Sequence, residues 1–300
     1  MSGRLHDQNH FFKYASFKTA IRIIQGHSFQ WSTPVKFNDP FDHQAGFVLD
    51  IDEAEFASLL SASIERVIFT DVHLGEGPSP VFTNLLLMLR TMRDRLPRQD
   101  ILTEIYQTSL TVAQNIKDGV DTFNIAVHSH LCHSRVFCVS EQHDNIVMWS
   151  HYADEHRGVV FKLRCIDAID NRLLAARQVI YTDSFLSFPS ANQYARHLTG
   201  EQPIDMVALS RNAAFTKHLD WSYEKEWRVH IPLLNEPEGD GYAIYDEDPQ
   251  IFEAVYLGCR MAKEQIQTVV KAIQTYLPKT EIYLAERSKK SFTLSFQKVS

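Results

Sequence analysis

Two blocks of strand-like sequence flank a long helical stretch, and this arrangement restricts the possible folds more than any other feature. Short alternating apolar runs occur before residue 52 and after residue 134, whereas apolar residues recur at helical spacing from 52 to 133. Strands that are grouped rather than alternating with helices are typical of α+β proteins. We therefore expect one α+β domain over residues 1–300, with a mixed or antiparallel sheet and a helical insertion at 52–133.

The first block predicts a strand, a helix and a second strand. The expected elements are strands at 11–15 and 27–31 and a helix at 17–25. Ser16 is the expected N-cap of this helix, and Gly26 is its expected left-handed C-terminal residue. The turn-forming sequence Phe37-Asn38-Asp39-Pro40-Phe41-Asp42 comes next, and we expect Phe37 and Phe41 to anchor it on the core.

The later elements follow from the same periodicities. The expected helices are 51–69, 81–96, 101–117, 120–130, 145–153, a largely helical 191–217, and 262–276. The expected strands are 135–140, 159–163, 179–182, 224–231, 254–257, 281–284 and 292–296.

Composition and charge exclude several classes of protein. The net charge of −7 is not that of a chain with a broad nucleic-acid-binding surface. No segment approaches the roughly 18 unbroken apolar residues of a membrane-spanning helix, and the polar start lacks the apolar core of a secretory signal. Four scattered cysteines do not form a disulfide framework. We expect a soluble cytoplasmic protein that does not contact membranes.

The sequence Glu224-Lys225-Glu226-Trp227-Arg228 is the sharpest chemical signal. In an extended strand, Glu224, Glu226 and Arg228 lie on one face. Two neighbouring carboxylates repel, so one has a raised pKa or is neutralised by a cation. Such a pair suits chemistry at an anomeric carbon, where one carboxylate stabilises positive charge and the other takes a proton. A solvated strand face in which Arg228 pairs with the glutamates is the alternative.

Ser140 marks the end of a predicted strand, and the helix after it carries Trp149 and Tyr152 at a spacing that places them on one face. This aromatic pair could stack a flat ring, although packing in the core is the commoner use of such residues. The loop at Asn38 is either a substrate-positioning loop or a simple Asx turn.

Histidine and cysteine also cluster in His128-Ser129-His130-Leu131-Cys132-His133, with Cys138 five residues on. These are the usual zinc ligands, but no paired-ligand spacing is present. A metal-dependent hydrolase or nuclease is therefore a minor alternative, and we assign no metal ligands.

Together the motifs resemble an uncharacterised bacterial family known as domain of unknown function 2971. The matching segments, in the family's order, are Phe12–Ser16, Phe37–Asp42, Phe137–Glu141, Met148–Ala153 with His156–Gly158, and Glu224–Arg228.

The chain is also distantly similar to ADP-ribosyltransferases, which have a split mixed sheet. Those enzymes present, in order, an Arg or His on a strand, a Ser or aromatic element, and a catalytic Glu. Here Lys13-Tyr14, Ser140 and Glu224-Lys225-Glu226 stand at these positions, and Lys13 or Tyr14 replaces the expected Arg or His.

This resemblance implies NAD-dependent ADP-ribosyl transfer or NAD hydrolysis, in a toxin or phage-defence context. Glu226 and Glu224 are the implied catalytic residues. NAD, as substrate, is expected to contact Lys13, Tyr14, Asn38, Ser140, Trp149, Tyr152 and Arg228. The acceptor is unknown, and an antitoxin or other partner protein is a further expectation. A non-catalytic nucleotide-sensing or partner-binding module is the main alternative.

Overall fold

The alternating segments at the two ends of the chain form one large sheet. The computed structural model describes residues 4–42, 47, 52–75, 77–95, 97–184, 186–233 and 241–299. Among these residues, the sheet strands are β1 (His10–Ala15), β2 (Ser28–Ser32), β3 (Ser134–Ser140), β4 (Val159–Arg164), β5 (Arg177–Gln178), β8 (Glu226–Pro232), β9 (Tyr242–Asp246), β10 (Phe252–Leu257), β11 (Glu281–Arg287) and β12 (Leu294–Lys298). Two shorter strands, β6 (Ile180–Thr182) and β7 (Thr216–His218), pair separately.

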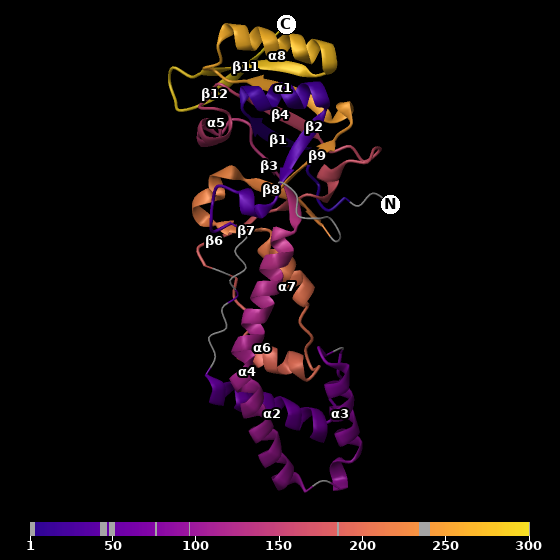
Figure 1. Ribbon diagram of the computed structural model, residues 1–300. Helices are drawn as coiled ribbons and strands as arrows, with labels where there is room; N and C mark the ends of the chain where they lie inside the picture. The colour runs from indigo at the N-terminus through magenta and orange to yellow at the C-terminus, as the bar shows by residue number, and fades with distance from the viewer. Residues whose placement is uncertain are drawn as a thin grey trace. The chain divides into compact units, whose positions relative to one another are not determined.

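The strands follow the order β12-β11-β10-β4-β1-β3-β2-β9, and β8 pairs with β3 and β5 (Figure 1). Only β10 and β11 run parallel in this ten-stranded sheet; the other pairs are antiparallel. The α+β class and the mainly antiparallel sheet are thus confirmed. The finer expectation, an ADP-ribosyltransferase-like sheet, stays a prediction.

Strand β3 separates from β1 along most of its length. The two strands pair only where Phe12 lies opposite Ser140, whereas β3 pairs with β8 from Ser134 to Ser140. Near its start β3 instead contacts β2, through Val136 opposite Ser32. The sheet therefore opens between β1 and β3.

Helices cover both faces of this sheet. Apolar residues of α1 (Phe17–Gly26) and α8 (Lys263–Tyr276) share one core with Phe11, Phe161 and Val255 of the strands. The opposite face packs Phe12 and Tyr14 against α5 (Ile146–Tyr152). Because successive strand residues point to opposite faces, β1 contributes to both cores.

The start of α1 is as predicted, but its end differs. The Ser16 side chain accepts a hydrogen bond from the Thr19 amide, which makes Ser16 the N-cap. Gly26 is the last helical residue, and His27 takes the left-handed conformation with φ of 48°. Histidine tolerates this conformation better than most side chains, so the glycine was not needed there.

The chain divides into two units. One comprises residues 1–43, 130–183 and 214–300, and the other comprises residues 44–129 and 184–213. The sheet lies in the first unit. The second unit takes in residues 184–213 as well as the helical stretch, a combination that the sequence patterns did not suggest. The single domain with an insertion at 52–133 stays a prediction.

The second unit is built from helices. They are α2 (Glu53–Phe69), α3 (Pro80–Thr91), most of α4 (Arg98–Cys132), α6 (Ala191–Leu198) and α7 (Met206–Ala213). Residues 101–130 form one continuous helix, not two, because Gly119 is accommodated within α4. Lys217 lies in β7, so the helical prediction for 191–217 ends too late. Ile51 and Leu96, the predicted ends of two helices, lie outside the described residues.

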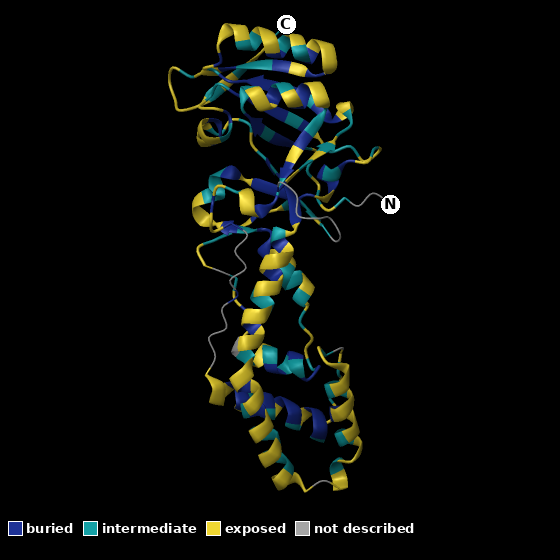
Figure 2. Cartoon of the chain, viewed as in Figure 1, coloured by how far each residue is buried: buried dark blue, intermediate teal, exposed yellow. Residues whose placement is uncertain are grey.

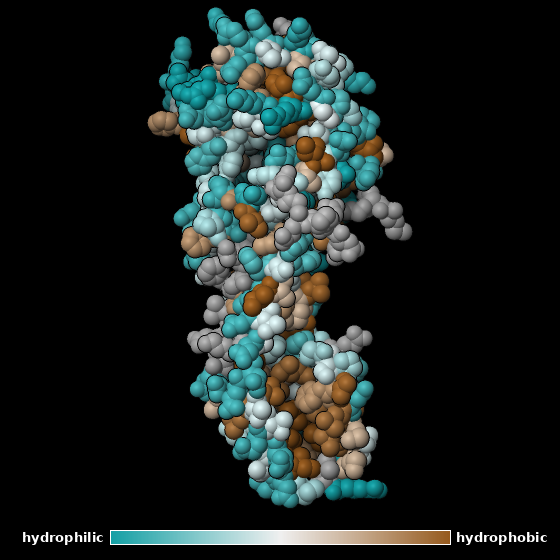
Figure 3. Space-filling view, viewed as in Figure 1, coloured by the Kyte–Doolittle hydropathy of each residue, from teal (hydrophilic) through white to brown (hydrophobic). Residues whose placement is uncertain are grey.

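Burial is uneven among these helices. Phe56, Leu60 and Ile64 of α2 form the centre of their core, whereas α3 and α4 expose long stretches (Figure 2). Figure 3 shows apolar residues on the surface of this unit. The exposed large apolar residues of α3 are Val81, Leu85, Leu87 and Met88. No helix among the described residues has the length and apolarity needed to cross a membrane.

Gly158 is the last residue before β4 and has no room for a side chain. A Cβ atom there would lie 2.2 Å from the Ala15 carbonyl oxygen and 2.8 Å from the Ala153 carbonyl carbon. We expect Gly158→Ala to lower the free energy of unfolding by about 1–3 kcal/mol, because backbone must move. All four tryptophans (31, 149, 221 and 227) lie in the first unit, so urea denaturation followed by tryptophan fluorescence reports on it.

Gly119→Ala is the matched control. A Cβ atom at this α4 position meets nothing within 4 Å, so the variant should stabilise the second unit by about 0.5–1 kcal/mol. Circular dichroism follows the helices of that unit. Equal effects of the two alanines would contradict the steric argument.

Candidate functional site

A cavity of about 420 Å³ lies in the first unit, where β1 and β3 separate. Its wall includes residues of β1, the Lys36–Asp42 segment, β3, α5 and the segment that leads into β8. This volume is within the roughly 300–1,000 Å³ of small-molecule sites. The cavity therefore provides a ligand-sized space beside the two glutamates.

The two glutamates reach the cavity by a route that differs from the predicted strand alternation. Glu224 ends a 3-10 helix (Leu219–Glu224), Lys225 is left-handed with φ of 45°, and β8 begins at Glu226. Because of this turn, both carboxylates still point to the same cation, the ammonium group of Lys217. The alternation prediction was wrong for Glu224, but the predicted juxtaposition is present.

Hydrogen bonds to the backbone hold this turn in place. The Ser140 hydroxyl donates to the Glu224 carbonyl (2.6 Å) and accepts from the Gln142 amide (3.1 Å). The Glu226 amide donates to the Tyr181 hydroxyl at 2.8 Å. Ser140 thus supports Glu224 from the neighbouring strand.

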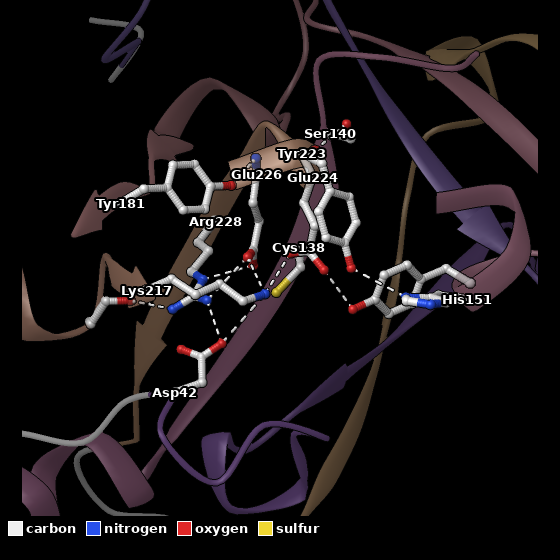
Figure 4. A network of polar contacts seen from close by, with 12 residues as sticks. Asp42, Cys138, Ser140, His151, Tyr181, Lys217, Tyr223, Glu224, Glu226 and Arg228 are labelled. Carbon is white, nitrogen blue, oxygen red and sulfur yellow. Dashed lines mark hydrogen bonds and ion pairs between the residues drawn. The ribbon is translucent and has the colours of Figure 1, made fainter. Parts of the chain in front are cut away.

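Lys217 is the cation that joins the two glutamates (Figure 4). Its Nζ lies 2.5 Å from Glu224 Oε2, 2.9 Å from Glu226 Oε2 and 3.7 Å from Asp42 Oδ2. All four side chains are buried. The paired carboxylates are therefore neutralised by a cation, as one of the sequence alternatives required.

Arg228 forms the inner end of the same network. Its guanidinium donates to Glu226 Oε1 (2.8 Å), Asp42 Oδ2 (2.7 Å) and the Ala214 carbonyl (3.0 Å), and the residue is fully buried. Arg228 does not line the cavity. It supports Glu226 from the side away from the cavity, and its contact with a ligand stays a prediction.

The surroundings move the pKa values of the two glutamates in opposite directions. Burial opposes ionisation of Glu226, but Arg228 and Lys217 outweigh it and hold the pKa of Glu226 well below its usual value. Burial and the neighbouring Glu226 charge raise the pKa of Glu224, and Lys217 only partly offsets them. Burial lowers the pKa of Lys217, but the charges of Glu226, Glu224 and Asp42 raise it by more. The pKa of Lys217 therefore lies above its usual value. Glu226 is thus held as an anion, and Glu224 is the more easily protonated of the two carboxylates.

Helix α5 supplies a third partner for Glu224. The Asn145 side chain caps the helix by accepting from the Val147 and Met148 amides. The Tyr152 hydroxyl then donates to Glu224 Oε1 at 2.6 Å, and burial raises the pKa of this tyrosine. Asn38 and Tyr152 both line the cavity, which brings the Asx-turn loop to the site.

The other predicted ligand contacts separate into two groups. Lys13, Tyr14, Asn38, Ser140 and Tyr152 all line the cavity. Trp149 does not; it is fully buried, and its indole donates to the His143 carbonyl at 2.6 Å. Trp149 therefore packs in the core, which is the alternative use of this aromatic pair considered above.

The loop after β2 is an Asx turn that also reaches the cavity. Asp39 Oδ1 accepts from the Phe41 amide at 2.9 Å, which confirms the Asx turn; a role of the loop in positioning a substrate stays a prediction. Phe37 lies against the Arg228 guanidinium, 5.7 Å from ring centroid to Cζ. Phe41 is 68% exposed, so the expectation that it anchors the loop was wrong.

Sequence reasoning did not identify Lys217, Tyr181 or the role of Asp42. Asp42 was visible in the turn motif, but Lys217 lies on a three-residue strand too short to show a pattern. The histidine-rich segment ends α4, and Cys138 lies apart in β3 beside Glu226. Among the described residues, no group of three His, Cys, Asp or Glu side chains is placed to hold a metal ion.

Comparison with known proteins gives one match. Residues 148–229 match the model of a family described as "Protein of unknown function (DUF2971)". This span includes α5, Lys217, the glutamate pair and Arg228, and it supports the resemblance to that family over these residues. No curated protein and no solved structure matches the chain.

Arg228 should be essential to the stability of the first unit. Arg228→Met leaves Asp42 and Glu226 buried without their main cation, and we expect a loss of about 3–5 kcal/mol in the free energy of unfolding. Arg22→Met, at an exposed position of α1, is the control and should change it by less than about 0.5 kcal/mol. Urea denaturation monitored by tryptophan fluorescence measures both; a small effect of Arg228→Met would contradict the network.

The raised pKa of Glu224 predicts a pH dependence. A raised pKa in the folded state means that this group's contribution to stability is present below about pH 4.3 and is lost as pH rises through its folded pKa. Glutamine does not titrate. The difference between the free energies of unfolding of the wild type and Glu224→Gln (wild type minus variant) should therefore fall as pH rises from 4 towards neutrality. A pH series of unfolding measurements on both proteins gives this difference. A difference that grows with pH would show a lowered pKa instead.

Proposed function

We propose that this site cleaves the N-glycosidic bond of NAD and passes the ADP-ribosyl group to an acceptor or to water. The observation that carries the proposal is the pair of cavity-lining glutamates with opposite pKa shifts, lowered for Glu226 and raised for Glu224. Titratable pairs whose environments separate their pKa values are typical of acid–base sites.

The two carboxylates suit the two needs of glycosidic cleavage. Positive charge develops on the ribosyl group as the bond to nicotinamide breaks, and the fixed negative charge of Glu226 favours that state. Glu224, in its ionised form, takes the proton from the attacking acceptor or water. Lys217 lies within 2.9 Å of both carboxylates and keeps them together during this change.

The cavity wall suggests how the substrate is held. Asn38 is exposed at the rim, so its amide is accessible to a ribose hydroxyl. The Tyr14 hydroxyl donates to the Gln142 carbonyl and that of Ser140 to the Glu224 carbonyl. We assign these two residues to shaping the wall, and Asn38 and Tyr152 to substrate contact.

One observation favours a non-catalytic nucleotide-binding module instead. Both oxygens of Glu226 are already bonded, Oε1 to Arg228 and Oε2 to Lys217 and Arg228. An ion network of this kind can serve structure alone. Turnover distinguishes the two functions, since a binding module has none.

Nicotinamide release from NAD by the purified protein, with cell lysate as a source of acceptor, is the test. We expect Glu224→Gln to reduce the rate by about 10²-fold or more, because it removes the proton acceptor while keeping the shape. Glu264→Gln, at an exposed position of α8, is the control and should release nicotinamide at the wild-type rate. If the wild type binds NAD but releases none, the binding module is correct.

A further inference from the structure

Two lysines line the cavity outside the ion network of Asp42, Glu224, Glu226, Lys217 and Arg228. Asp42, Glu224 and Glu226 are paired with Lys217 and Arg228. Lys13 and Lys36 also line the cavity. Within the described part of the chain, neither has a carboxylate oxygen within 4.0 Å of its Nζ.

Lys13 spans the opening between β1 and β3. Its Nζ donates to the Cys138 carbonyl at 2.8 Å and lies 4.9 Å from the centre of the Phe137 ring. An ammonium group has three N–H donors, so this bond leaves donor capacity on the cavity side of the strand. Lys36, on the short 3-10 helix Pro34–Lys36, is exposed with its Nζ 5.8 Å from the centre of the Tyr242 ring.

The ammonium group of Lys13 is buried without a direct carboxylate contact, which is unfavourable for its charged form. Burial lowers the pKa of Lys13, and the charges of Cys138, Glu226 and Glu224 raise it by less. The two glutamates are already bound by Lys217, so they compensate Lys13 only from a distance. An anionic ligand in the cavity would lie beside this ammonium group and stabilise its charged form.

We propose that Lys13 and Lys36 bind a phosphate group of the ligand and make this a site for phosphorylated nucleotides. The inference rests on the site of the proposed function, for which it names the recognised group. Lysine acts on phosphate as a point charge, and two lysines on one cavity match a dianionic diphosphate better than a neutral nucleoside.

Isothermal titration with ADP-ribose, adenosine and inorganic pyrophosphate tests this binding without turnover. We expect ADP-ribose and pyrophosphate to bind the wild type, and adenosine to bind at least about tenfold more weakly than ADP-ribose. Lys13→Met and Lys36→Met should each weaken ADP-ribose binding by roughly tenfold or more, whereas Lys13→Arg, which keeps the charge, should bind within a few-fold of wild type. Lys263→Met, exposed on α8, is the control for loss of a surface lysine.

Wild-type affinity for ADP-ribose that Lys13→Met leaves unchanged would overturn the proposal, as would equal binding of ADP-ribose and adenosine. Should Lys13→Met fail to fold, a pH series on the wild type decides. The diphosphate of ADP-ribose keeps its charge, whereas Lys13, whose pKa burial lowers, loses its charge as pH rises. Binding should therefore weaken with rising pH before about pH 10.4, where ordinary lysines titrate. Affinity that stays constant up to that pH would overturn the proposal. Lysine-dependent ADP-ribose binding without nicotinamide release would refute the proposed catalysis alone.

Discussion

The buried contact of Arg228 with Asp42 and Glu226 is the interaction on which the site depends. Removing three charges from water is costly, and only close pairing with good hydrogen bonds compensates for it. Arg228 meets this condition with bonds of 2.7–3.1 Å to the two carboxylates and to the Ala214 carbonyl. The contact joins the turn after β2 to β8. It also fixes the charge of Glu226, which leaves Glu224 as the carboxylate whose protonation can change.

The residues of the candidate site could be predicted where they lay in short motifs. Glu224, Glu226, Ser140 and Tyr152 were visible because each belongs to a compact, unusual run of residues. Lys217 was not, because a single lysine on a three-residue strand carries no periodicity, and its partners are fixed only by tertiary packing. The sequence correctly predicted that Glu224 lies beside Glu226, but from an incorrect local structure. The left-handed turn at Lys225, and not strand alternation, brings the two carboxylates together.

The fold shows the same division between local and non-local information. Element types in the strand blocks follow from alternation, and Ser16 follows from capping chemistry. The break predicted within α4 is absent, because the cost of one glycine, about 1 kcal/mol, is small against the packing of a 35-residue helix. Strand β9, with its alternating burial, was overlooked between two loop-rich stretches. Nothing local indicates that residues 184–213 join the helical stretch to form the second unit.

The distance along the chain between the partners of Arg228 has a consequence for biosynthesis. Asp42 and Arg228 are 186 residues apart, and the whole of the second unit is encoded between them. During translation, the N-terminal strand and the turn leave the ribosome long before their partner strand exists. The Asp42 carboxylate must remain hydrated throughout that interval, and a truncated product that ends before β8 has neither the glutamates nor their cation in place. The site is therefore completed only after β8 has been synthesised, in keeping with the slow closure of long-range contacts.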